Sequence, residues 1–202
     1  MGLRNILIGG LIAGAVLGDG GCTPAYIPER TAIFLREEVK KKPLFVAIEG
    51  LGIRHEIGDL VKIVTAGGDI AGVATSGNWG AHLDLIRRAD ANGQEKHISG
   101  HSSGAYEAVL LAEQCIKEGI EIDGLYLLDP TVTARFKIKI PRVRYVANIR
   151  SDADDFVGGV RILGREYLED SSYTLLENVG VRGSHLGLPL NSAHLIRTRI
   201  RQ

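Results

Sequence analysis

A serine bracketed by glycines is the strongest candidate for chemistry in this chain. It lies in Gly100-His101-Ser102-Ser103-Gly104, between a short strand pattern over 96–99 and a helical pattern over 105–118. A strand–turn–helix of this kind lifts a serine hydroxyl above the end of a sheet, and the flanking glycines let strand and helix approach each other. The pattern therefore predicts Ser102 as a nucleophile. The Ser103 N–H, at the helix start, is then placed to donate to a developing oxyanion.

The elements that must position this serine alternate between short apolar segments and helical patterns from about residue 43 onward. We expect strands at 44–48, 70–74, 96–99, 124–128 and 143–149, with a weaker one near 174–181. Helices are expected at 56–66, around 83–86, at 105–118 and around 193–196. This alternation predicts an α/β fold, a mostly parallel twisted sheet with helices on both faces. Residues 31–202 show no internal boundary and are predicted to form one domain.

Over residues 43 to about 195 the chain resembles the α/β-hydrolase family, in a minimal form close to the small, nearly lidless bacterial lipases and esterases. The resemblance rests on the segment Gly100–Gly104 and on Glu49-Gly50-Leu51-Gly52, which follows the first strand. In the family that loop usually reads His-Gly, an apolar residue and Gly, so Glu49 departs from the pattern. The resemblance implies that the Leu51 N–H is the second oxyanion donor.

The family's chain order is serine, then acid, then histidine, and it narrows the choice of general base to two residues. His185 lies in the loop 183–188, just past the last predicted strand, and resembles the family's histidine loop. His194 lies in a helical pattern and is expected to be structural or exposed. His101 is interpreted as a fixed wall of the turn, because neighbouring residues on such a turn point apart. His55, His82 and His97 precede the serine and are interpreted as structural.

Two aspartates compete for the acid that orients His185. Asp154 is favoured, because it follows a strong strand and stands two residues before Phe156-Val157, as in the acid loop of the small lipases. Asp129, in Leu128-Asp129-Pro130, is the alternative, because larger pancreatic-type lipases carry their acid on an earlier strand with such an Asp-Pro step. Asp-Pro is also a common strand-ending turn. Asp152 and Asp155 are expected to be solvated loop charges.

This set of residues predicts a serine hydrolase that cleaves carboxylic esters through an acyl-enzyme, with no metal or organic cofactor. Thioesterase, amidase and acyltransferase activities remain open on the same triad, as does a non-catalytic hydrolase-like domain used for binding or in the cell envelope. The short segment Thr131–Pro141 stands where larger lipases insert a lid, so we expect an open site for short or medium acyl chains. Trp79 is a candidate pocket residue, although packing accounts for it equally well.

Charge and cysteine content limit the possible partners. Lys plus Arg and Asp plus Glu each total 24, so the formal charge is zero and no basic excess is available for nucleic acid. A small acyl ester or lipid is the expected substrate. The two cysteines, Cys22 and Cys115, are spaced neither like a metal site nor like a disulfide framework, and Cys115 is expected in the core.

The first 30 residues differ in kind from the rest. Arg4 precedes the uncharged apolar segment 6–17, which is too short to span a bilayer comfortably but resembles the apolar region of a secretory signal. Gly20-Gly21-Cys22 resembles a lipoprotein cleavage site, with Asp19 where a leucine-like residue is usual. Residues 1–30 are therefore interpreted as a leader or membrane anchor. Export or anchoring is about as well supported as a cytoplasmic chain whose apolar segment packs on the domain.

Overall fold

One parallel sheet forms the centre of the molecule. The computed structural model describes residues 42–50, 56–76, 79–130, 143–152, 155–157, 160–162 and 175–202. Within these ranges six strands pair in the order β2-β1-β3-β4-β5-β8, all parallel. The strands are β1 (Leu44–Glu49), β2 (Ala71–Ser76), β3 (Lys96–His101), β4 (Ile122–Leu128), β5 (Val143–Ser151) and β8 (Leu175–Val181). The predicted parallel sheet is confirmed.

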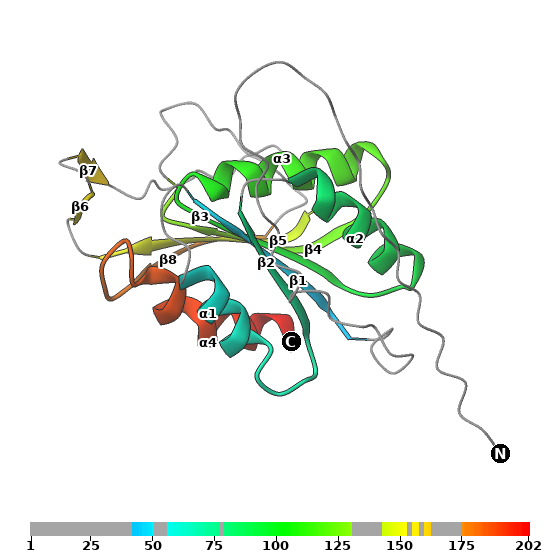
Figure 1. Ribbon diagram of the computed structural model, residues 1–202, viewed down its shortest axis with the longest axis horizontal. Coiled ribbons are helices and arrows are strands. Elements are labelled where there is room, and N and C mark those ends of the chain that lie inside the picture. The colour runs from blue at the N-terminus through cyan, green and yellow to red at the C-terminus, as the bar shows by residue number, and fades with distance from the viewer. Residues whose placement is uncertain are drawn as a thin grey trace.

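Helices cover both faces of this sheet, as predicted (Figure 1). They are α1 (Glu56–Val64), α2 (Trp79–Ala91), α3 (Gly104–Lys117) and α4 (Leu188–Ile200). The helices α2 and α3 lie on one face, and α1 and α4 lie side by side on the other. The domain therefore has three layers: the sheet is the middle layer, and a pair of helices covers each of its faces.

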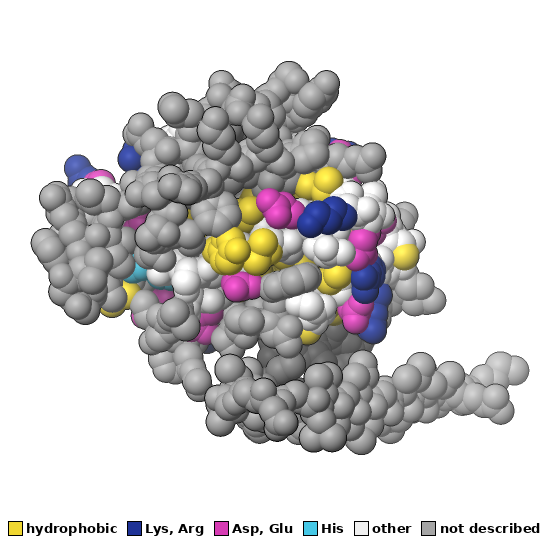
Figure 2. Space-filling model, turned by 90° about the horizontal axis from the view of Figure 1, so that it is seen from above, with side chains coloured by type: hydrophobic (Ala, Val, Ile, Leu, Met, Phe, Trp, Pro, Cys, Tyr) yellow, Lys and Arg dark blue, Asp and Glu magenta, His cyan; other side chains and the backbone are white. Residues whose placement is uncertain are grey.

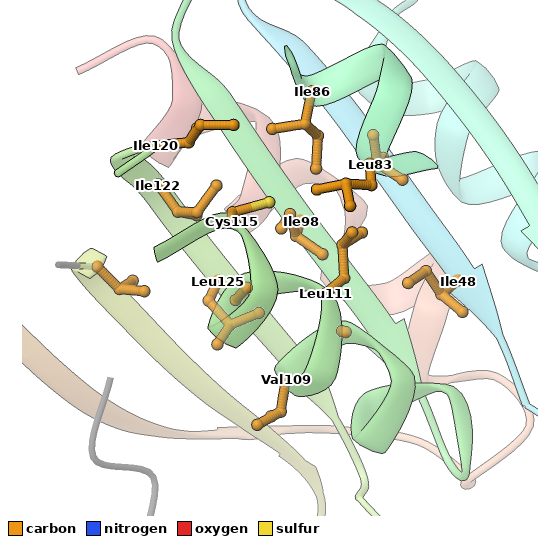
Figure 3. Close-up of a cluster of buried hydrophobic side chains, with 14 of the residues drawn as sticks. Ile48, Leu83, Ile86, Ile98, Val109, Leu111, Cys115, Ile120, Ile122 and Leu125 are labelled. Atoms are coloured by element: carbon orange, nitrogen blue, oxygen red, sulfur yellow. The ribbon is translucent and has the colours of Figure 1, made fainter. Parts of the chain in front are cut away.

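The side chains of β1 show how the sheet separates two hydrophobic clusters. Val46 and Ile48 belong to the cluster under α2 and α3, which Figure 3 shows, whereas Phe45 and Ala47 belong to the cluster under α1 and α4. Successive side chains of a strand point to opposite faces, so a strand buried on both faces reads as a continuous apolar segment. Burial of each large aliphatic side chain contributes about 1.5–3 kcal/mol.

Cys115 lies in the cluster under α3, as expected from its helical pattern (Figure 3). It is a free thiol, and burial raises its pKa to about 12. A thiol in this state is neither a nucleophile nor a metal ligand at neutral pH. Cys115 is therefore a packing residue.

A short hairpin that is not among the predicted elements follows β5. The strands β6 (Asp155–Val157) and β7 (Val160–Ile162) pair antiparallel, with Asp155 opposite Ile162. Asp155, expected to be a loop charge, thus lies in a strand. Three residues are too few for a periodic pattern, but Gly158-Gly159 between two apolar segments is a recognised hairpin signal.

The face that carries α2 and α3 has mixed polarity (Figure 2). Hydrophobic side chains lie in its middle, and basic side chains lie beside acidic ones. Arg87 on α2, for example, pairs with Asp84 at 2.7 Å and with Glu118 at 2.7 Å. Basic charge is therefore neutralised locally around Arg87.

The predicted leader, residues 1–30, lies outside the described residues. Among the residues that are described, none of the helices is long and apolar enough to cross a membrane.

Candidate active site

Ser102 occupies a strained turn between β3 and α3. Its backbone has a φ of 56°, a left-handed conformation that costs a non-glycine residue about 1–3 kcal/mol. The Ser102 N–H donates to the Leu128 carbonyl at 2.9 Å, which ties the turn to the end of β4. A Cβ on Gly100 would lie 2.6 Å from the Gly104 carbonyl carbon, so glycine is required for strand and helix to come this close. Ser102 therefore stands at the carboxyl edge of the sheet in the geometry of a nucleophile elbow.

The end of β1 lies directly against this turn. A Cβ on Gly50 would come within 2.7 Å of the His101 carbonyl oxygen, 2.9 Å of the Ser102 Cβ and 3.2 Å of the Ser103 nitrogen. Such an approach is open only to glycine. Gly50, the last described residue after β1, therefore lies beside the Ser103 backbone nitrogen. Leu51, the predicted donor, lies outside the described residues.

Asp129 stands at the end of β4, next to the serine-bearing strand in the sheet. Its backbone is also left-handed, with a φ of 39°, and its N–H donates to the Ile149 carbonyl at 2.9 Å. One carboxylate oxygen, Oδ1, accepts the Ser151 N–H at 2.8 Å. The other, Oδ2, lies 3.2 Å from His185 Nδ1. Asp129 thus holds the predicted base by its Nδ1 edge.

The loop carrying His185 is braced at several points by the end of β5. The Ser151 hydroxyl donates to the Gly183 carbonyl, and the Gly183 N–H donates to Asp152 Oδ1 at 3.0 Å. Asp152, expected to be a solvated loop charge, is exposed but braces this loop. Together with Asp129 these contacts bring His185 from β8 across the end of β5 toward Ser102.

His101, directly before the nucleophile, also contacts this loop. Its Nε2 lies 2.9 Å from the His185 carbonyl oxygen, and the two imidazole ring centres are 4.6 Å apart. Both residues are about 1% exposed. Burial, with a smaller contribution from the neighbouring His185, lowers the pKa of His101 to about 4, so the ring is neutral at pH 7. The sequence predicts His101 only as a wall of the turn, and this contact with the His185 loop has no local sequence signal.

The structure thus brings together Ser102, Ser103, His185 and the alternative acid Asp129. The favoured acid, Asp154, lies outside the described residues, as does the lid-position segment Thr131–Pro141. Trp79 begins α2, but its side chain is not among those described. Of the remaining histidines, His194 is exposed on α4, His82 and His97 are buried, and His55 lies outside the described residues.

This arrangement fits acyl transfer. A carboxylate on His185 Nδ1 fixes the tautomer whose Nε2 carries the lone pair and stabilises the imidazolium that forms when Nε2 takes a proton. The Ser103 N–H at the start of α3 lies where the helix dipole favours negative charge. Within the described ranges, no group of three or more His, Cys, Asp or Glu side chains could hold a metal ion.

Comparisons with known proteins identify solved structures that have a similar fold. No protein-family model matches the chain, and no curated protein matches it in sequence. Solved structures do match. An esterase from Pyrobaculum calidifontis has a TM-score of 0.55 and 13% identity, with 80% of this chain and 76% of that chain covered.

In two further similar structures, the match to this chain covers most of the other chain's length. One chain, from the structural work on the metagenome-derived lipolytic enzymes LipS and LipT, has a TM-score of 0.53 and 13% identity, with 80% of this chain and 94% of that chain covered. The NocB thioesterase domain has a TM-score of 0.53 and 16% identity, with 81% of this chain and 96% of that chain covered. At such low identities the likeness establishes the fold.

Proposed function

We propose that this chain, which has the α/β-hydrolase fold, is a serine hydrolase that cleaves carboxylic esters through an acyl-enzyme. The observation that carries the proposal is the buried pair of His185 and Asp129, packed through His101 against the strained turn of Ser102. A left-handed serine is costly unless the surrounding structure holds it there, and such strain is concentrated at functional sites.

The reaction has two steps on one histidine. As the Ser102 Oγ attacks the ester carbonyl, His185 Nε2 takes the hydroxyl proton, and the tetrahedral intermediate collapses when the same proton passes to the leaving alcohol. Water then attacks the acyl-enzyme and gives its proton to His185. The carboxylic acid leaves, and the serine regains its proton.

We propose Asp129 as the acid in place of Asp154, which lies outside the described residues. Only one carboxylate can accept the His185 Nδ1–H, and Asp129 Oδ2 is the one within reach among the described residues. Asp129 is itself fixed, because its other oxygen accepts the Ser151 N–H at 2.8 Å. A carboxylate held on both oxygens keeps the imidazole in one orientation.

For the oxyanion we propose two backbone donors, the N–H groups of Ser103 and Leu51. The support for Ser103 is its place at the N-terminus of α3, where the helix dipole favours negative charge. The support for Leu51 is that Gly50, its neighbour, approaches the elbow so closely that a Cβ would lie 3.2 Å from the Ser103 nitrogen.

We infer the substrate class from exposed apolar side chains that are close in the chain to the nucleophile and the base. Two large hydrophobic residues are exposed in the described part of the chain, Tyr106 at 37% and Leu186 at 41%. Tyr106 lies in the first turn of α3, four residues after Ser102, and Leu186 follows His185. Side chains so close in the chain to nucleophile and base favour an ester with an apolar acyl part. We keep Trp79, at the start of α2, as a candidate pocket residue.

A thioesterase is the second candidate, because thioesterase domains are among the similar structures. The same serine, histidine and oxyanion donors serve either acyl donor, and the fold does not select between them. Rates on an oxygen ester and on a thioester of the same acyl chain would separate the two.

A fluorophosphonate probe tests the proposal directly. The full chain should gain one phosphonyl group, located by peptide mass spectrometry on Ser102, and Ser102→Ala should gain none. p-Nitrophenyl esters of graded chain length would then define the acyl preference. A wild-type protein that stays unlabelled and inactive on every ester would instead point to a non-catalytic binding domain.

A further inference from the structure

We propose that His101 is a positioning residue that locks the loop of the general base to the turn of the nucleophile. This inference rests on the proposed function, because it concerns how His185 is held relative to Ser102. His101 is bonded in the chain to Ser102 and hydrogen-bonded in space to the backbone of His185. It is thus a direct link between the two reacting residues.

The hydrogen bond assigns the proton on the His101 ring. The His185 carbonyl can only accept, so His101 Nε2 must donate across the 2.9 Å between them. The ring is 1% exposed, and burial lowers its pKa to about 4. His101 is therefore a neutral ring with its proton on Nε2, and this nitrogen has no lone pair with which to accept the Ser102 proton.

The two rings also pack on each other. Their centres lie 4.6 Å apart with an angle of 35° between the planes, so His101 covers part of one face of the His185 ring. Asp129 holds the Nδ1 edge of the same ring at 3.2 Å. His185 is thereby restrained at three places: its backbone carbonyl, its ring face and its Nδ1 edge.

Neutrality at this position matters when the reaction begins. Two neighbouring titratable groups act on His101: His185 lowers its pKa, and Asp129 raises it. A cation at this position would repel the imidazolium that forms on His185 during acyl transfer. A neutral donor holds the loop without opposing that charge.

Two substitutions separate the hydrogen bond from the ring. His101→Gln keeps an amide N–H that can reach the His185 carbonyl, whereas His101→Phe keeps an aromatic ring without a donor. We expect His101→Phe to lower kcat on a p-nitrophenyl ester about 100-fold with KM nearly unchanged, since a displacement of about 1 Å in a reacting group costs this much. His101→Gln should recover kcat to within about tenfold of the wild type.

The matched control is His97→Phe. His97 lies on the same strand β3 at the opposite edge of the sheet, and it is also buried, at 5% exposure. His97→Phe should lower the melting temperature but leave the kcat of the folded protein unchanged. If His101→Phe behaved in the same way as this control, the positioning role would be overturned.

A spectroscopic measurement on the wild type keeps the test independent of how the variants fold. Nitrogen-15 NMR of the histidine rings should show His101 with its proton on Nε2 at pH 7 and no titration near pH 6.5. Observation of the Nδ1–H form, or of a titration near 6.5, would overturn the inference. Failure of the proposed function is distinguishable, because the wild type itself would then react with neither the ester nor the fluorophosphonate.

Discussion

His185 Nδ1 lies 3.2 Å from Asp129 Oδ2, and each of the two residues is only 1% exposed. A buried carboxylate is costly unless its oxygens accept hydrogen bonds, and both oxygens of Asp129 do so, from Ser151 and from His185. In such a site the attraction between the carboxylate and a forming imidazolium is much stronger than in water. The pair is therefore suited to stabilise charge on His185 during a reaction.

Replacement of the acid should act on catalysis more than on folding. In Asp129→Asn the amide oxygen can still accept the Ser151 N–H, but the amide NH₂ faces His185 Nδ1 and favours the wrong tautomer. We expect kcat to fall by about 10⁴-fold, as in the corresponding serine-protease substitution. Ester hydrolysis and a urea unfolding curve would measure both effects.

Asp154→Asn is the matched control for the acid. It removes the carboxylate that the sequence favoured, and we expect kcat to stay within about tenfold of the wild type. Strong inactivation of this variant together with an active Asp129→Asn would return the role to Asp154.

The nucleophile can be tested with two substitutions that differ in backbone strain. Ser102→Ala and Ser102→Gly should each lower turnover by about a million-fold, by analogy with the subtilisin serine. Because Ser102 has a φ of 56°, glycine should relieve strain that alanine retains, and Ser102→Gly should be more stable than Ser102→Ala by ~0.5–1 kcal/mol. Equal stability of the two variants would argue against a strained turn.

Much of the fold could be predicted from the sequence, because its signals are local. The segment Leu44–Ile48 is apolar at every position, and helix α3 repeats small and apolar residues at helical spacing, so both elements were predicted within two residues of their ends. The glycines around Ser102 are likewise a local signal, because they allow β3 and α3 to approach each other closely. The hairpin of β6 and β7 was missed because each strand has three residues.

The acid could not be chosen from the sequence, because Asp129 and Asp154 both follow strands of the same sheet. What distinguishes Asp129 is tertiary: β4 pairs directly with β3, and the left-handed turn at Asp129 directs its carboxylate to His185. The contact between His101 and the His185 carbonyl joins residues 84 positions apart, so no local sequence pattern predicts it.

The approach of Gly50 to the elbow can be tested by adding one methyl group. In Gly50→Ala the new Cβ would meet the His101 carbonyl oxygen at 2.7 Å, so the loop must move away from the Ser103 N–H. We expect kcat to fall on the order of 100-fold, the effect of losing one oxyanion donor, and stability to fall by ~1–3 kcal/mol.

Gly58→Ala provides the control for that substitution. Gly58 lies in α1, and a Cβ there has nothing within 4 Å. Alanine should stabilise the helix by ~0.5–1 kcal/mol with kcat unchanged. If Gly50→Ala also kept the wild-type kcat, the loop after β1 would have no part in oxyanion binding.

The last prediction concerns acid stability and the buried histidine His82. Burial lowers its pKa to about 4, and neither ring nitrogen has a hydrogen-bond partner among the residues that the structure describes. As the pH falls below 6.5 the unfolded chain binds a proton at this residue, whereas the native chain does not until about pH 4, so stability is lost over that window. The loss is at most ~1.4 kcal/mol per pH unit, roughly 3 kcal/mol in all.

His82→Leu removes this proton uptake. Its effect is measured as the difference in the free energy of unfolding between the variant and the wild type. The free energy of unfolding of the variant minus that of the wild type should rise by roughly 3 kcal/mol from pH 7 to pH 4, because only the wild type loses stability through His82. Burial also lowers the pKa of His97 and His101, so both proteins still lose stability in acid. The exposed His194, changed to Leu, is the control and should leave the pH dependence as in the wild type. Urea unfolding at half-unit steps of pH measures the difference, and parallel curves for His82→Leu and the wild type would show that His82 does not remain neutral in the folded protein.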